Sequence, residues 1–309
     1  MNEQRRVVPA TFLVGETKLC PPDQLPSSID SLYDYLELIG VPGYSYHQCP
    51  SQLEDILMVG GKLCYRSFKV GLNKNVTQIR EDPLEYLTNI NKVGHGSVLE
   101  HGNVSFIFHN VSRVFTHELV RHRVGIAFSQ ESLRYVRLTE LEGFLPTCLD
   151  DDWGRHWHQE KMELMSQWQA ELARHYQIDS MSDFTRKKEL TSAFRRYAPI
   201  GLATSILCSM NIRTLRHNIQ MRTDSSAEEE IRFVFHQVAQ ICVSQYPYIF
   251  GDFYHDKVVN SIPVWRSRFA STPYDQQKMA ELQKENNRLK ERIKVLEFDL
   301  SLIDWGKVK

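Results

Sequence analysis

The sequence predicts an α+β fold, in which helices pack around a mixed or antiparallel sheet, followed by a separate C-terminal coiled-coil helix. Apolar residues recur at helical spacing in several stretches, and a heptad pattern occupies the end of the chain. Three polar motifs lie at residues 94–101, 121–135 and 211–228, and the sheet is expected from the resemblance that these motifs carry, described below. With 309 residues, 42% of them hydrophobic, the chain can bury a large core.

The composition excludes several classes of protein. The formal net charge is −1, so no overall basic field attracts nucleic acid, and no nucleic-acid partner is expected. Six widely spaced cysteines without a CxxC pair argue against a zinc ribbon or a disulfide framework, and no metal site is predicted. No signal peptide or long apolar span is visible, so we expect a cytoplasmic protein without a membrane partner.

The first elements are an extension and a short helix. Residues 1–50 are rich in proline and glycine, which break regular structure, and we predict an N-terminal extension or cap. Further along, Phe115, Leu119 and Val120 have the spacing of a half-buried helix that ends at Arg121.

Residues 155–178 predict an exposed amphipathic helix, with apolar side chains at helical spacing from Leu164 to Tyr176. His156 and His158 lie near its start, where a surface position explains them better than a metal site. The helix is therefore expected to be structural.

A long helix is predicted to start just after Arg222. Ser225 and Glu228 form a capping-box pattern ahead of an apolar run. A linker over residues 261–275, which contains Pro263, is expected to separate the main domain from the tail.

Residues 276–304 predict a coiled coil. Asn286 stands at heptad position a, where a lone asparagine commonly selects two strands in register. Glu285 at position g can meet Lys290 at position e of a partner chain. We therefore expect self-association; the alternative is an amphipathic helix packed on its own domain. The a positions are Met279, Asn286, Ile293 and Leu300, and the d positions are Leu282, Leu289, Leu296 and Ile303.

A strongly polar motif begins at Arg121-His122-Arg123 and continues as Ser129-Gln130-Glu131-Ser132-Leu133-Arg134-Tyr135. A core cannot absorb so many polar groups without partners, so a binding site is predicted here. Consecutive side chains cannot share one helix face, so Arg121 and Arg123 are expected to face different ligands or subunits. A solvated helix end is the alternative for the triplet alone.

An upstream motif reads Gly94-His95-Gly96-Ser97-Val98-Leu99-Glu100-His101. Its hydroxyl and carboxylate lie three residues apart and can share one side of a turn. A capping box between Ser97 and Glu100 explains these two residues equally well. The position just upstream of Arg121 favours a joint site.

A downstream motif runs from Asn211-Ile212-Arg213-Thr214-Leu215-Arg216-His217 to Arg222. Arg222 could be a solvated residue beside the predicted helix start. A helix dipole disfavours a cation there unless an anion also binds, which supports a ligand role for Arg222.

Taken together, the three motifs resemble the signatures of the flavin-dependent thymidylate synthases. The resemblance runs from about Ser51 to Tyr254 and departs from the family pattern in one place. Arg123 and Ser132 are separated by one residue more than the usual spacer. By resemblance the fold is α+β, residues 51–260 form the catalytic domain, and the protein is a homotetramer with active sites between subunits.

The resemblance also implies ligands and residue roles. FAD is the cofactor, dUMP is the substrate, and methylenetetrahydrofolate and NADPH are co-substrates. His217 stands where many family members have an asparagine, and it can still form a hydrogen bond. Arg222 is the catalytic residue. The cofactor-binding positions are Ser67, His95, Ser97, Glu100, Arg121, His122, Arg123, Asn211, His217 and Met221. The nucleotide-binding positions are Glu118, Arg121, Gln130, Glu131, Ser132, Leu133, Arg134, Arg195 and Arg222.

The chemistry explains these residue types. Methylation at C5 of a uracil ring needs electron density at that carbon, and a cation near the N3–C4=O4 edge stabilises the developing charge. Arginine suits this role because it stays ionised and its planar fork matches planar acceptors. Ser132 and Arg134 are expected to hold the phosphate through charge-assisted hydrogen bonds. No cysteine lies in an activated context, so thiol addition is not predicted.

Two alternatives remain open. The same flavoenzyme could methylate another pyrimidine nucleotide such as UMP, or the chain could be a non-enzymatic oligomeric scaffold assembled through its tail. The longer loop after Arg123 is expected to bulge against the nucleotide. Apolar surface beside the sugar would disfavour an extra ribose hydroxyl, so dUMP is favoured over UMP.

Overall fold

The computed structural model describes residues 5–20, 24–269, 281 and 284–294. The chain divides into two compact units, Met1–Arg266 and Ser267–Lys309. None of the helices in the described part of the chain has the length and apolar character needed to cross a membrane.

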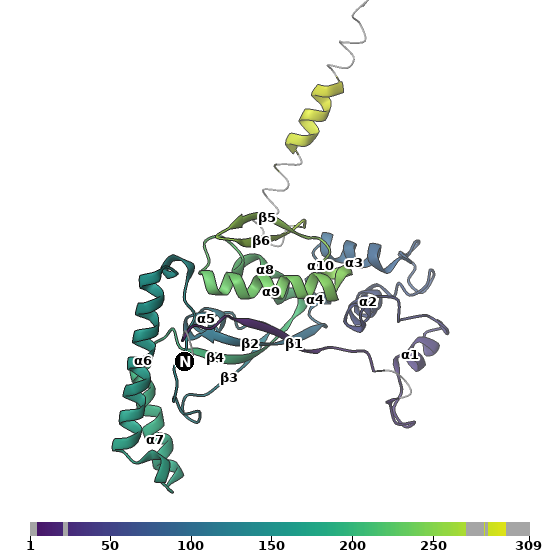
Figure 1. The fold of residues 1–309 in the computed structure, drawn as a ribbon. Coiled ribbons are helices and arrows are strands. Elements are labelled where there is room, and N and C mark those ends of the chain that lie inside the picture. Colours follow the sequence, from purple (N-terminus) through teal and green to yellow (C-terminus); the bar gives the residue numbers. More distant parts are fainter. Residues whose placement is uncertain (1–4, 21–23, 270–280, 282–283, 295–309) are drawn as a thin grey trace, which may run out of the picture. The chain divides into compact units, whose positions relative to one another are not determined.

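An antiparallel sheet of four strands forms the centre of the first unit (Figure 1). In spatial order the strands are β1 (Ala10–Glu16), β2 (Asn103–Ser112), β4 (Ala203–Asn211) and β3 (Ile126–Gln130). Each of the three pairings between neighbours is antiparallel, which confirms the antiparallel form of the predicted sheet. Because β1 comes from the predicted N-terminal extension, that segment supplies an edge strand of the sheet.

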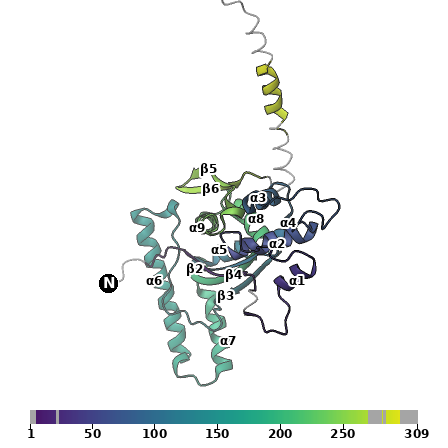
Figure 2. The same cartoon turned by 90° about the vertical axis from the view of Figure 1, so that its right-hand side faces the viewer.

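Helices cover one face of this sheet (Figures 1 and 2). Side chains along β2 and β4 alternate between buried and more exposed, as a sheet with one covered face requires. Buried residues such as Phe106 and Cys208 share one hydrophobic core with three helices. These are α5 (Arg113–Leu119), α8 (Ile212–Arg222) and α9 (Glu229–Gln245).

Shorter helices complete this core. Asn91 is buried and its side-chain amide donates to the carbonyl oxygen of Ile249 at 3.1 Å, which ties α3 to α10. The shorter helices are α1 (Leu32–Leu38), α2 (Gln52–Tyr65), α3 (Pro83–Lys92), α4 (Gly96–Leu99) and α10 (Pro247–Phe250).

Helices α6 (Asp152–His175) and α7 (Phe184–Phe194) form a hairpin beside the sheet (Figure 2). The predicted helix over residues 155–178 is thus confirmed, but much of the apolar stripe from Leu164 to Tyr176 is exposed. The buried side chains of α6 include Met162, Ser166, Gln169 and Ala173. Three single-turn helices lie nearby in the sequence: η2 (Thr147–Leu149), η3 (Ile178–Ser180) and η4 (Arg195–Tyr197).

One histidine of α6 differs from the prediction. His158 is buried rather than on the surface, and its Nε2 lies 3.2 Å from the carbonyl oxygen of Arg5. It is therefore a packed residue that ties the helix to the N-terminal segment.

The predicted start of the long helix is wrong. Arg222 is the last residue of α8, and α9 begins only at Glu229. The carboxylate of Glu228 caps α9 by accepting from two backbone N–H groups of its first turn, so Ser225 is not the cap.

The end of the first unit also differs from the prediction. Strands β5 (Phe253–Val259) and β6 (Ile262–Ser267) form a separate two-stranded sheet. Pro263 therefore lies in a strand, and the predicted linker over residues 261–275 is wrong for residues 262–267. In the second unit, residues 284–294 are helical, as the heptad pattern predicts. The rest of the predicted coil, apart from residue 281, lies outside the described residues.

Candidate active site

Helices α5 and α8 hold the predicted catalytic arginine between them. Arg222 ends α8, where the helix dipole favours a cation, and its side chain is 12% exposed. Its guanidinium donates to the main-chain carbonyl of Glu118 at 2.6 Å and to the Glu118 carboxylate at 3.2 Å. The Nε of Arg222 is buried without a hydrogen-bond partner in the described structure. The guanidinium is therefore fixed in place and keeps one donor unpaired.

Further cationic or titratable side chains lie near Arg222. Burial lowers the pKa of Arg222, and the nearby Arg121 lowers it further, while Glu118 acts in the opposite direction. Burial also lowers the pKa of His122, and the charges of Arg222, His217 and Arg121 add to this effect. The rings of His122 and His217 lie 6.3 Å apart. We call these five residues, Glu118, Arg121, His122, His217 and Arg222, the α5–α8 cluster.

A second cluster lies at the start of α5. The guanidinium of Arg113 donates to the carbonyl oxygen of Glu131 at 3.1 Å, and the Glu131 carboxylate accepts from the backbone N–H of Ser205 at 3.3 Å. Burial lowers the pKa of Arg113, and the nearby charge of Arg195 lowers it further. The Nε of Arg113 is buried and has no partner among the described residues. Two neighbouring guanidinium groups with an unpaired donor have the chemistry of an anion site.

The end of β3 and the loop after it carry further predicted nucleotide-binding residues. Gln130 donates from its amide to the hydroxyl of Thr116 on α5 at 3.2 Å. The hydroxyl of Ser132 accepts from the backbone N–H of Arg134 at 3.3 Å, and the Arg134 side chain is exposed. Leu133, also a predicted nucleotide-binding residue, packs its side chain against a small hydrophobic cluster.

The longer spacer of the 121–135 motif lies against the start of α8. Asn211 caps this helix, and its backbone N–H donates to the carbonyl oxygen of Gly125 at 3.0 Å. The hydroxyl of Thr214 donates to the carbonyl oxygen of Val124 at 3.0 Å. Gly125 has φ +71°, and a Cβ there would lie 2.3 Å from the Asn211 side chain, so glycine is required. These contacts join the longer loop to the start of α8, where Asn211 is a predicted cofactor-binding residue, so they do not support the predicted bulge against the nucleotide.

The upstream motif lies beside the same end of α8; its Ser97 and Glu100 are exposed, whereas Val98 and Leu99 are buried. Glu100 pairs with Arg213 at 2.7 Å, with side chains 47% and 60% exposed. Helix α4 has no side-chain cap, so Ser97 and Glu100 do not form a capping box. His95 stacks on Tyr65 with ring centroids 5.7 Å apart.

Three other predicted cofactor-binding residues differ in exposure. Ser67 is buried after the end of α2, where its backbone N–H donates to the carbonyl oxygen of Lys62 at 2.9 Å. Met221 is half-buried near the end of α8, and Arg123 is exposed. The structure thus places the predicted cofactor residues after the end of α2, around α4, in the loop after α5, and along α8.

Comparison with known proteins agrees with these motifs. The family model for thymidylate synthase complementing protein matches residues 49–248. The chain belongs to the flavin-dependent thymidylate synthase family. It is 32% identical over 230 residues to the flavin-dependent thymidylate synthase of Corynebacterium glutamicum, covering 72% of this chain and 86% of the relative. It is 34% identical over 202 residues to that of Mycobacterium tuberculosis, covering 62% and 76%.

A solved structure resembles the chain more distantly. The crystal structure of thymidylate synthase X from Helicobacter pylori, with FAD and dUMP, has 21% sequence identity and a TM-score of 0.45. The match covers 64% of this chain and 93% of that chain.

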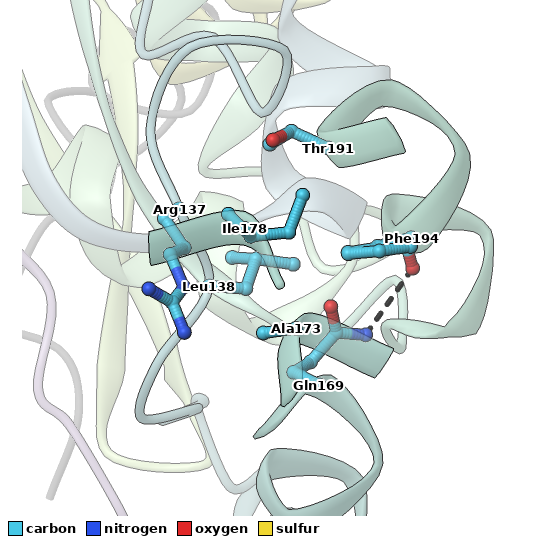
Figure 3. A pocket seen from close by; sticks show the side chains of 7 residues that line it. All are labelled: Arg137, Leu138, Gln169, Ala173, Ile178, Thr191 and Phe194. Atoms are coloured by element: carbon cyan, nitrogen blue, oxygen red, sulfur yellow. Dashed lines mark hydrogen bonds between the residues drawn. The ribbon is translucent and has the colours of Figure 1, made fainter. Parts of the chain in front are cut away.

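Four cavities formed by described residues lie away from the three motifs. Figure 3 shows a cavity of about 10 Å³, which has room for no more than a water molecule. Gln169 donates to the carbonyl oxygen of Phe194 at 3.2 Å beside it. Three larger cavities, of about 230, 310 and 460 Å³, are lined by residues outside the predicted site. The lining residues in Figure 3 are Arg137, Leu138, Gln169, Ala173, Ile178, Thr191 and Phe194.

Sequence analysis missed Arg113. It directly follows a strand, and nothing in its local sequence marks it as more than a surface residue. Its neighbours Glu131 and Arg195 are far away along the chain, so the cluster becomes visible only in the folded protein.

Proposed function

We propose that the protein binds FAD and converts dUMP to dTMP, with methylenetetrahydrofolate as carbon donor and NADPH as reductant. Membership of an enzyme family supports catalysis over the scaffold alternative. The α5–α8 cluster carries the proposal, because it holds Arg222 in one orientation with an unpaired donor. We also propose a cytoplasmic homotetramer, in which a neighbouring subunit covers the exposed motif residues.

Arg222 has the properties needed to polarise a pyrimidine ring. Its contacts with Glu118 fix the guanidinium before substrate arrives, so little reorganisation is needed as charge develops on the ring oxygen. Because its lowered pKa favours the neutral form, His122 adds little charge near neutral pH. The neutral ring can accept or donate a hydrogen bond beside the substrate.

The Arg113 cluster suits the phosphate of the nucleotide. Arg113 and Arg195 lie close enough to lower the pKa of Arg113, and a dianion between them would relieve their repulsion. Ser132 and Arg134 follow on the loop after β3 and supply further donors. Gln130 ties this loop to α5, which also carries Glu118.

The exposed groups beside α8 suit a flavin nucleotide. Ser97 and Arg123 offer exposed donors, and Glu100 offers a carboxylate that can accept from ribose hydroxyls. Asn211 caps α8 through its side-chain oxygen, which leaves its amide NH₂ group as a donor. When bound, FAD would carry the electrons between reductant and nucleotide.

One assay tests the proposal. The purified protein should be yellow, or should change its visible spectrum when FAD is added. With methylenetetrahydrofolate and NADPH it should convert dUMP to dTMP, detected by chromatography. A colourless protein that ignores FAD would overturn the proposal. UMP should be assayed in parallel to test which nucleotide accepts the methyl group. Faster turnover of UMP than of dUMP would identify UMP as the substrate.

A further inference from the structure

The C-terminal tail carries an apolar helix face that the proposed active site does not use. Residues 284–294 are helical, and within this helix Leu289 and Ile293 are 48% and 52% exposed. With Asn286 they occupy successive heptad positions a, d and a. A short isolated helix is marginal in water, and exposed apolar side chains add nothing to its stability. This helix therefore needs a partner that covers the face.

We propose that the partner is the same tail of a second copy of this chain, in a parallel, two-stranded coiled coil. Charge complementarity supports this occupant. Glu285 at position g and Lys290 at position e have opposite signs, and g faces e of the next heptad across a parallel pair. The opposite side of the helix is polar, since Glu291 and Lys294 form an exposed ion pair at 3.0 Å.

Asn286 selects the orientation and register. In a parallel, in-register pair, Asn286 meets Asn286 of the partner subunit, and the two amides can bond to each other. An antiparallel pair would instead set the amide opposite an apolar d residue. A buried amide without a partner costs about 1–3 kcal/mol, so the parallel pair is favoured.

Cysteine crosslinking in the full chain tests this pairing. Leu289→Cys and Ile293→Cys should each form covalent dimers through the introduced cysteine under mild oxidation, since equivalent a or d residues lie together in a parallel pair. Glu291→Cys, on the polar side, is the matched control and should crosslink far more slowly. Mass spectrometry must locate the new disulfide because native Cys20, Cys64 and Cys148 are exposed. Equal crosslinking of all three variants, or of only one a or d variant, would overturn the proposal.

Charge reversal provides an independent test. In the Leu289→Cys background, Glu285→Lys or Lys290→Glu should slow crosslinking because each puts like charges at the g–e contact. Both changes together should restore the rate, because the pair is re-formed with its signs exchanged. A double variant no faster than either single variant would overturn the charge pairing. FAD binding should be unaffected in every variant, so these outcomes are distinguishable from failure of the proposed function.

Discussion

The two ends of α8 carry two arginine–glutamate pairs that differ in burial. At the C-terminal end, Arg222 and Glu118 are 12% and 29% exposed, with an N···O distance of 3.2 Å. At the N-terminal end, Arg213 and Glu100 are 60% and 47% exposed, at 2.7 Å. The shorter pair is the more exposed one, so distance does not rank their importance.

The solvent around each pair explains the difference in role. Water weakens an exposed pair to about 0–1 kcal/mol, whereas a half-buried pair is screened less, so removing one partner costs more. The helix dipole favours Arg222 at the C-terminus and disfavours Arg213 at the N-terminus. The Arg222 pair is therefore a fixed support, and the Arg213 pair can exchange a partner for a ligand.

The largest expected effect comes from breaking the less exposed pair, Arg222 with Glu118. Arg222→Ala should lower turnover by about 10²–10³-fold at saturating substrate, the usual effect of losing a preorganised electrostatic donor. Arg222→Lys should recover little, because an ammonium cannot reproduce the planar fork. Steady-state kinetics with FAD occupancy checks this, with Arg186→Ala in the exposed α7 pair as control. Weaker dUMP binding with unchanged turnover would show that Arg222 only binds substrate.

The Arg113 cluster should affect binding rather than turnover. Arg113→Ala or Arg195→Ala should each raise the KM for dUMP by about 10–100-fold, since a charge-assisted hydrogen bond contributes about 1.5–3 kcal/mol. FAD occupancy should be retained. The KM for deoxyuridine, which lacks the phosphate, should be the same in these variants as in the parent enzyme. If both variants lost FAD and dUMP together, the phosphate assignment would fail.

The pKa of His122 depends on the charge of Arg222 at the C-terminal end of α8. Arg222 is among the charges that lower the pKa of His122, whereas Arg213 is not, so Arg222→Ala should raise this pKa and Arg213→Ala should not. The unfolded ring binds protons more readily than the folded one. Its contribution to stability is therefore complete above about pH 6.5 and is lost as the pH falls below that value. NMR titration of the ring measures the shift, and equal shifts in both variants would contradict the comparison.

The smallest effect on stability is expected from the exposed pair. Glu100→Gln should change the free energy of unfolding by less than about 1 kcal/mol, as for other exposed pairs. The same variant should weaken FAD binding if Glu100 contacts the cofactor. Denaturant unfolding and FAD titration measure the two quantities separately. A large loss of stability would show that this pair is structural.

Local sequence signals predicted some elements and misplaced others. The spacing of Phe115 and Leu119 correctly predicted the half-buried α5, because one helix face buries its apolar residues. Ser225 and Glu228 are both plausible caps, and the choice between them depends on where α8 ends. That end is held by contacts of Arg222 with a residue 104 positions away, which a local pattern cannot register.

The residue types and their order along the chain were sufficient to identify the family, because that chemistry requires particular side chains, and they supply the predicted site residues. Folding decided which of them meet. Three features of the site join distant segments of the chain. Arg113 lies near Glu131 and Arg195, the loop at Gly125 contacts Asn211, and Arg222 at the end of α8 pairs with Glu118. Hydrogen bonds act over about 3 Å, so such contacts exist only once the sheet and helices have brought these segments together.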